Sequence, residues 1–201
     1  MSSLLIGDTE AVCNFLRDRL NRLQQFAVKK LAKAWIKGIC PKKQADFPYT
    51  NEQKRKRDGA DSAPAAWWPS LDKCPFIEPD HVKKGREWHC LLSHRYLLTT
   101  MSARVELCIH LLRLRPTPEQ LKLWNKGTAE PHPTHSFVGW TAFLEELLSP
   151  KDLDQVNELR NDSDKLRQRQ SYLRDLYEVA RMEEEFVAHR GCGMWPGMCG
   201  A

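Results

Sequence analysis

The sequence has 201 residues, of which 41% are hydrophobic and 28% charged, a composition that suits one folded domain with a long appendage. Its longest apolar run falls well short of the roughly 20 residues that cross a bilayer, which excludes a membrane-spanning helix. The short apolar patch in residues 1–7 has no basic residue before it and is followed at once by Asp8 and Glu10, so a secretory signal is not expected. We therefore expect an intracellular protein.

The formal net charge of +5 is unevenly distributed along the chain. Residues 1–57 contain 13 Lys and Arg against 5 Asp and Glu, a net +8, whereas residues 58–150 carry −1 and residues 151–201 carry −2. This asymmetry predicts a basic arm on a near-neutral body, and such an arm meets nucleic acid or the acidic groove of a receptor.

The first predicted element is a long amphipathic helix over residues 9–37, within an arm of residues 1–40. Thr9 is the expected N-cap, and Gly38 and Pro41 end the helix. The apolar positions, at steps of three and four, are Val12, Leu16, Leu20, Leu23, Ala27, Leu31 and Trp35. The basic positions are Arg17, Arg19, Arg22, Lys29, Lys30, Lys33 and Lys37. Core packing with a solvated basic face is favoured, and contact of that face with a membrane surface, nucleic acid or a partner helix is the alternative.

A flexible basic linker is predicted over residues 41–64, which are rich in proline and polar side chains. The linker contains two basic clusters separated by ten residues, and these are Lys42 and Lys43, then Lys54, Arg55, Lys56 and Arg57. Two clusters at this spacing on an extended chain can fill two acidic pockets together. The pattern is typical of a bipartite nuclear import signal, so we predict nuclear localisation through an import receptor. A solvated or RNA-binding run is the alternative.

Irregular chain is predicted over residues 65–84, because three prolines exclude a continuous helix or a central strand. Trp67 and Trp68 are costly to leave in water, so we expect them to be buried against the first or the C-terminal helix. Stacking of these rings on nucleic-acid bases is the alternative. Asp80 is predicted to cap the helix that follows.

The next predicted helix covers residues 104–115 and is strongly apolar. Residues 86–103, which precede it, differ in composition from both flanks. Their removal would join Gly85 to Arg104 in one amphipathic helix that starts at Asp80. We therefore interpret residues 86–103 as a translated retained intron or an insertion.

Three further helices are predicted, over residues 117–125, over residues 134–148 and over most of residues 151–190. Residues 191–201 are expected to be disordered. The fold class is thus predicted to be all-α, with a long N-terminal helix, a flexible basic linker and a small helical domain over residues 65–190. That domain ends in a long C-terminal helix.

The residues that could carry chemistry form no convincing site. The seven cysteines are odd in number and irregularly spaced, which is typical of reduced thiols. The potential metal ligands that lie closest in sequence are Cys74, His81, His89, Cys90 and His94. They lack the tight paired spacings that zinc prefers, and Glu78 and Asp80 are better explained by capping and ion pairs than by acid–base catalysis. With no P-loop, dinucleotide fingerprint or nucleophile elbow, we expect no enzyme activity, no metal and no cofactor.

Four motifs of this chain resemble the core of a fungal family. They are Trp67, Trp68 and Pro69; Glu78, Pro79, Asp80 and His81; the helix Arg104–Arg113; and the segment Leu173–Glu184. The family is that of the hypoxia-responsive morphology factor and its paralogues in a mould subtelomeric gene cluster, and the resemblance covers roughly residues 65–190 without residues 86–103. It implies a nuclear protein that modulates gene expression, the hypoxia response and colony or biofilm form, and it implies no catalytic residues.

The leading hypothesis from the sequence is therefore a non-enzymatic nuclear regulatory protein that acts through protein partners or DNA. An RNA-processing enzyme, or an accessory subunit of one, is the alternative. The expected partners are an import receptor and other nuclear proteins, with nucleic acid as an open alternative and no membrane.

Overall fold

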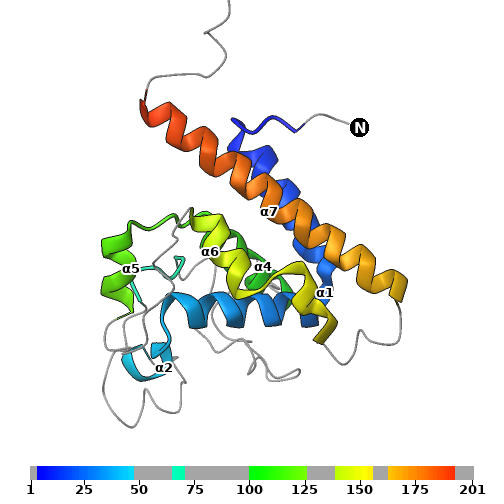
Figure 1. Ribbon diagram of the computed structural model, residues 1–201, viewed down its shortest axis with the longest axis horizontal. Coiled ribbons are helices and arrows are strands. Elements are labelled where there is room, and N and C mark those ends of the chain that lie inside the picture. The colour runs from blue at the N-terminus through cyan, green and yellow to red at the C-terminus, as the bar shows by residue number, and fades with distance from the viewer. Residues whose placement is uncertain (1–3, 48–64, 71–99, 126–138, 156–162, 193–201) are drawn as a thin grey trace, which may run out of the picture. The chain divides into compact units, whose positions relative to one another are not determined.

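The computed structural model describes residues 4–47, 65–70, 100–125, 139–155 and 163–192 (Figure 1). All regular structure in these ranges is helical, which confirms the all-α fold class and the long N-terminal and C-terminal helices. The chain divides into two compact units, one of Met1–Leu23 with His132–Ala201 and one of Gln24–Pro131. The boundary lies inside the first helix, whereas the sequence analysis placed its boundaries after residues 40 and 64.

The first unit contains the N-terminal part of α1 (Thr9–Ile39), together with α6 (Trp140–Leu147), the 3-10 helix η2 (Pro150–Gln155) and α7 (Ser163–Cys192). The cap of α1 is Asp8 and not the expected Thr9. The Asp8 carboxylate accepts hydrogen bonds from the backbone N–H groups of Glu10 and Ala11 at 2.9 and 3.0 Å. A short acidic side chain in this position also suits the positive end of the helix dipole.

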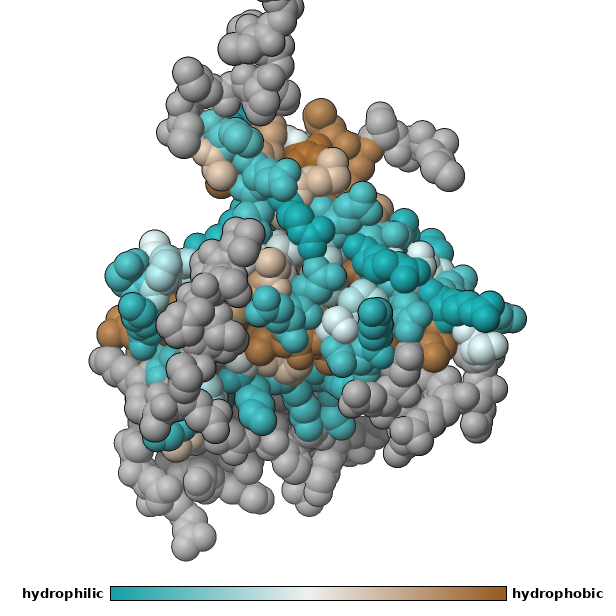
Figure 2. Space-filling view, in the orientation of Figure 1, coloured by the Kyte–Doolittle hydropathy of each residue, from teal (hydrophilic) through white to brown (hydrophobic). Residues whose placement is uncertain are grey.

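The core of the first unit consists of one apolar stripe from each helix. The buried residues are Val12, Leu16, Leu20 and Leu23 of α1, Trp140, Phe143 and Leu144 of α6, and Leu173, Leu176, Tyr177 and Ala180 of α7. Their spacing of three and four residues places them on one face of each helix. Figure 2 shows that the outer face of α7 is hydrophilic. The buried stripe occupies only the middle of α7, since Val187 is 48% exposed.

Helix α7 holds both ends of α6. The Tyr177 hydroxyl donates a hydrogen bond to the backbone carbonyl of Leu148 at 2.6 Å, just after the last turn of α6. The Glu184 carboxylate accepts hydrogen bonds from the first two backbone N–H groups of α6 at 2.6 and 2.9 Å. These donors would otherwise lack a partner at the helix start. A Cβ atom at Gly139 would lie 3.1 Å from the Glu184 carboxylate, so a larger residue there would require the carboxylate to shift by a few tenths of an ångström.

The second unit contains the rest of α1, with α2 (Lys43–Asp46), α4 (Thr100–Leu112) and α5 (Pro118–Trp124). Its buried apolar residues are Ala27, Val28, Leu31, Ala32, Trp35, Ile36 and Ile39 of α1, Trp67 and Trp68, Val105, Leu107, Cys108, Ile109, Leu111 and Leu112 of α4, and Leu121 of α5. Helix α2 lies inside the segment that was predicted to be a flexible linker. Burial of Lys43, which is 3% exposed, ties this start of the linker to the unit.

Helix α5 opens as the sequence predicted. The Thr117 hydroxyl accepts a hydrogen bond from the backbone N–H of Gln120 at 3.3 Å, and the Gln120 side chain accepts one from the backbone N–H of Thr117 at 2.9 Å. Pro118 occupies the first turn, where its missing N–H costs nothing. A capping box joins residues that are only three positions apart, which is why the sequence alone could locate this helix start.

Helix α4 begins at Thr100, four residues before the expected start. The last four residues of the segment interpreted as an insertion, residues 100–103, therefore supply the first turn of the helix. Arg104 and Val105, which follow them, are 6% and 1% exposed. Residues 86–99 and Asp80 lie outside the described residues, so the interpretation as an insertion remains a prediction for that part.

The long helix predicted over residues 9–37 is present, but it is interrupted at Gln24, which the sequence did not predict. Gln24 has φ 67° and ψ 170°, a region of backbone space that is occupied almost only by glycine. Holding a residue with a side chain there costs about 1–3 kcal/mol, which the packing of the two units must offset. The surrounding sequence has no glycine or proline, so nothing in its composition marks the break.

Candidate functional site

The tryptophan motif forms a tight, buried turn in the second unit. The Trp68 backbone N–H donates to the carbonyl of Ala65 at 2.8 Å. The centres of the two indole rings lie 5.8 Å apart and their planes are tilted by 56°. Trp67 is 1% exposed and Trp68 is 6% exposed. The structure thus confirms the predicted burial of these rings. Because they are buried, no base could stack on them unless the turn opened.

Two helices contact this turn through polar side chains. The backbone carbonyl of Trp67 accepts a hydrogen bond from His110 Nε2 of α4 at 3.0 Å, which requires the proton on that nitrogen. The ammonium group of Lys43 in α2 lies 5.5 Å from the centre of the Trp68 ring, within range of a cation–π interaction. His110 and Trp67 both belong to the family motifs, so the fold gives these motif residues a structural role.

The described residues include the first basic cluster of the predicted import signal but not the second. Lys42 is exposed, but Lys43 is buried beneath Trp68. Lys54, Arg55, Lys56 and Arg57 lie outside the described residues, as do Glu78, Pro79, Asp80 and His81. An import receptor binds extended chain with accessible side chains, so Lys43 would have to leave Trp68 before it could be bound. The signal as predicted therefore depends mainly on the second cluster.

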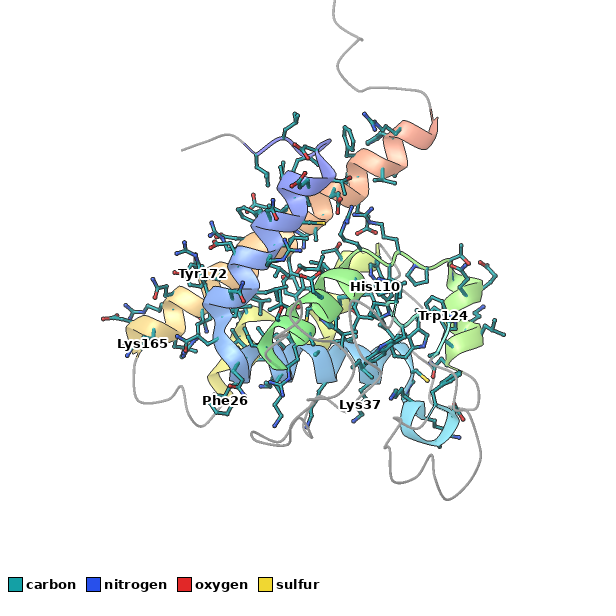
Figure 3. The ribbon with its side chains drawn as sticks, turned by 180° about the vertical axis from the view of Figure 1, so that it is seen from behind. Phe26, Lys37, His110, Trp124, Lys165 and Tyr172 are labelled. Carbon is teal, nitrogen blue, oxygen red and sulfur yellow. The ribbon has the colours of Figure 1, made fainter. Side chains whose placement is uncertain are left out.

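A row of lysines follows the exposed side of α1 in the second unit. Lys30, Lys33 and Lys37 share one face because they are three and four residues apart, and we call this surface the lysine face. Lys33 and Lys37 are exposed and Lys30 is half-buried. Phe26, which is 51% exposed, lies on the same side of the helix, and Figure 3 labels Phe26 and Lys37 along the same edge of the light blue half of α1.

The opposite side of this half of α1 is packed into the core, where Leu31, Ala32 and Trp35 are at most 1% exposed. The lysine face is therefore carried on a fixed helix and not on a loop. Lys30 and Lys37 are separated by about 10 Å along the helix axis, which is comparable with the Debye length at physiological salt. Three ammonium groups over that distance act together on phosphates or carboxylates.

The arginines of the first half of α1 have a different environment. Arg19 pairs with Asp175 of α7 at 2.9 Å, and its guanidinium group lies 5.7 Å from the centre of the Tyr172 ring, which is labelled in Figure 3. Arg22 pairs with Asp18 at 2.8 Å, and the hydrogen bond to Asp18 raises the pKa of Arg22. The sequence analysis placed these arginines and the lysines on one basic face, but the structure divides them between two units and engages the arginines internally.

Cys13, Cys40 and Cys108 form no disulfide bond in the structure. Cys40 and Cys108 are buried and Cys13 is half-buried. Burial, with a smaller contribution from Asp46, raises the pKa of Cys40 to about 11, so it stays a neutral thiol near pH 7. Across the described ranges, no group of three or more His, Cys, Asp or Glu side chains could hold a metal ion.

Some residues that organise the structure carried no signal of that role in the sequence. The Glu184 cap on α6 and the burial of Lys43 are long-range contacts. The sequence analysis had grouped Glu184 with a family motif without assigning it a role. Only a pattern of paired changes among related sequences could have identified such contacts in advance.

None of the helices described by the structure combines the length and the apolar content that a bilayer span requires.

Comparison with known proteins places these features in a fungal context. The chain is 31% identical over 121 residues to a protein of Aspergillus fumigatus (strain CBS 144.89 / FGSC A1163 / CEA10) named as a subtelomeric hrmA-associated cluster protein. The alignment covers 56% of this chain and 21% of that relative, so the chain spans about a fifth of the length of the relative. No solved structure matches the chain significantly.

A family model described as "YDR124W-like, helical bundle domain" matches residues 1–193. This match begins well before residue 65, where the sequence analysis began the family core, and it includes all of α1. The helical character of the family also agrees with the structure. The chain therefore belongs to the family of YDR124W-like helical bundle domains.

Proposed function

We propose that this protein is a non-enzymatic nuclear regulatory protein that modulates gene expression by binding nucleic acid, or an acidic partner protein, through the lysine face of α1. The observation that carries the proposal is that Lys30, Lys33 and Lys37 form one row on a helix whose other side is fixed in the core. A rigid, single-signed surface attracts phosphate and carboxylate groups from a distance and holds them without first having to fold.

The position of this surface in the chain also supports the proposal. The lysine face is followed, within the most basic quarter of the sequence, by the clusters predicted to bind an import receptor. Delivery to the nucleus and binding to an acidic target would then both involve the N-terminal part of the chain. The first half of α1 would serve to hold α7 in the first unit, through the ion pair of Arg19 with Asp175.

The biological setting that we propose is the hypoxia response and the control of colony or biofilm form. Its support is the resemblance noted in the sequence and the similarity to a relative whose name places it in a subtelomeric hrmA-associated cluster. The shared segment is a fifth of that relative, so the comparison concerns this domain and not the whole of the longer protein.

Localisation of a fluorescently tagged protein in fungal cells tests the proposal. Replacement of Lys54, Arg55, Lys56 and Arg57 by alanine is expected to leave the protein in the cytoplasm and to abolish its effect on transcript levels under hypoxia. Lys42→Ala with Lys43→Ala is expected to reduce nuclear accumulation less, because Lys43 already packs on Trp68.

A matched control removes four exposed basic residues of α7, namely Lys165, Arg167, Arg174 and Arg181. This variant is expected to enter the nucleus normally. Unchanged nuclear accumulation of the variant that lacks residues 54–57, or equal exclusion of both variants, would contradict the proposal.

A further inference from the structure

The break in α1 at Gln24 conflicts with the local sequence. Leu23, Gln24, Gln25 and Ala27 all favour a helix, and the apolar positions at steps of three and four run through the break without a change of phase. Gln24 nevertheless occupies backbone space that is largely restricted to glycine. The local sequence prefers a straight helix, so the bend is imposed by tertiary packing.

The buried apolar residues of α1 fall into two groups, one on either side of Gln24. Leu16, Leu20 and Leu23 are buried in the first unit, and Leu31 and Trp35 are buried in the second, all at 1% exposure or less. Each half of α1 therefore belongs, with its buried apolar stripe, to a different unit. The face of α7 that contacts the first half, through Asp175 and Tyr172, would be filled equally well by the same half of another molecule.

We propose that α1 can straighten at Gln24, so that residues 9–23 leave their own α7 and dock on the α7 of a second copy of this chain. Two copies that exchange these segments form a closed, symmetric dimer. Every contact of the first unit is kept, but it is made between chains. In addition, the strain at Gln24 is released in both copies. The loss of independent motion on association opposes the exchange, so it is favoured at high protein concentration.

One pair of side chains reports directly on the exchange. Arg19 Nε of α1 lies 2.9 Å from Asp175 Oδ2 of α7, and the two side chains are 23% and 35% exposed. In the monomer this ion pair lies within one chain. In the exchanged dimer it joins two chains, so the charges of the two partners can be manipulated separately.

The first experiment measures molar mass by light scattering over a range of protein concentrations. The wild-type chain is expected to shift from monomer to dimer as its concentration rises. Gln24→Gly should lower the association constant by roughly tenfold or more, because glycine relieves the strain of the bent form and disfavours the straight helix. Gln24→Ala should raise it by roughly a few fold, because alanine favours the straight helix.

The second experiment distinguishes exchange from association of intact monomers. Arg19→Asp and Asp175→Arg each place like charges against one another in a single chain. When the two variants are refolded together, the exchanged mixed dimer pairs opposite charges at both positions. Mixed dimers should therefore exceed the statistical share by several fold when native mass spectrometry counts them.

Arg181 and Glu145 provide the matched control, since they join α7 to α6 at 2.6 Å and neither lies in the exchanged segment. Mixing Arg181→Glu with Glu145→Arg should give the statistical share of mixed dimers. A monomeric mass at every concentration, for both the wild-type chain and Gln24→Ala, would overturn the proposal. Dimers with statistical mixing in both pairs of variants would also overturn it, because such dimers would associate without exchange.

Discussion

The two halves of α1 have similar sequences and different roles. Both carry an apolar stripe at steps of three and four, and both carry basic residues on the remaining surface. In the first half, Arg19 and Arg22 pair with carboxylates and lie against the Tyr172 ring. In the second half, Lys33 and Lys37 are exposed.

The chemistry of the two side chains helps to explain this difference. The guanidinium group is planar, so it can stack on an aromatic ring while its N–H groups bind a carboxylate at the same time. For Arg19 the first unit offers both partners on α7, whereas the carboxylate that pairs with Arg22 is Asp18 of α1. The lysine ammonium group is compact and strongly hydrated, and it suits a surface that exchanges water and counterions for an acidic ligand. A basic amphipathic helix can therefore use its basic residues for contacts within the protein along one half, as an internal clamp, and present a binding surface along the other half.

The largest effects should come from the apolar stripes, and they should be confined to one unit. Leu20→Ala is expected to destabilise the first unit and Leu31→Ala the second, each by about 2–5 kcal/mol, because both leucines are fully buried. Hydrogen exchange is the appropriate measurement, since it reports α7 and α4 separately. Loss of protection in α4 from Leu20→Ala, equal to that in α7, would show that α1 does not divide between two units.

The next largest effect should distinguish the helix caps of the two units. Glu184→Ala removes a carboxylate that reaches from α7 to the start of α6, and it should cost about 1–2 kcal/mol in chemical denaturation. Thr117→Ala removes the exposed, local cap of α5 and should cost about 1 kcal/mol or less. A larger loss from Thr117→Ala would mean that Glu184 does not hold α6 in place.

The smallest effect on stability should separate the two kinds of basic residue. Arg19→Ala is expected to cost about 1 kcal/mol, since it removes a half-buried ion pair together with a stacking contact. Lys37→Ala should change the free energy of unfolding by less than about 0.5 kcal/mol, because its side chain is exposed. Equal losses from the two substitutions would remove the distinction between a clamp and a binding surface.

The features that could be predicted from sequence are those with local causes. The apolar steps located the helices, and Thr117 with Pro118 marked the start of α5, because each signal is contained within one or two turns. The size of the Trp67 and Trp68 rings was enough to predict their burial. In these cases the hydrophobic effect and backbone geometry act on neighbouring residues, so a single sequence contains the information.

The features that escaped prediction depend on residues far apart in the chain. The break at Gln24 lies where the chain passes from one unit to the other, and the helical pattern of the sequence continues through it. Lys43 is buried because Trp68, 25 positions later, covers it. The separation of the arginines from the lysines, which defines the candidate site, follows from the position of Asp175 and Tyr172 on α7. No local pattern records these pairings.

The salt dependence of duplex DNA binding tests the central claim most directly. The lysine face should contribute up to three phosphate contacts, so replacing Lys30, Lys33 and Lys37 by alanine should weaken binding. It should also reduce the slope of log affinity against log salt by up to about 2.7. The control variant removes Lys165, Arg167 and Arg174 from α7 and should change that slope by less than about 1. Equal slopes for the wild-type chain and the lysine variant would contradict the proposal that the lysine face binds nucleic acid, and would leave an acidic partner protein as its target.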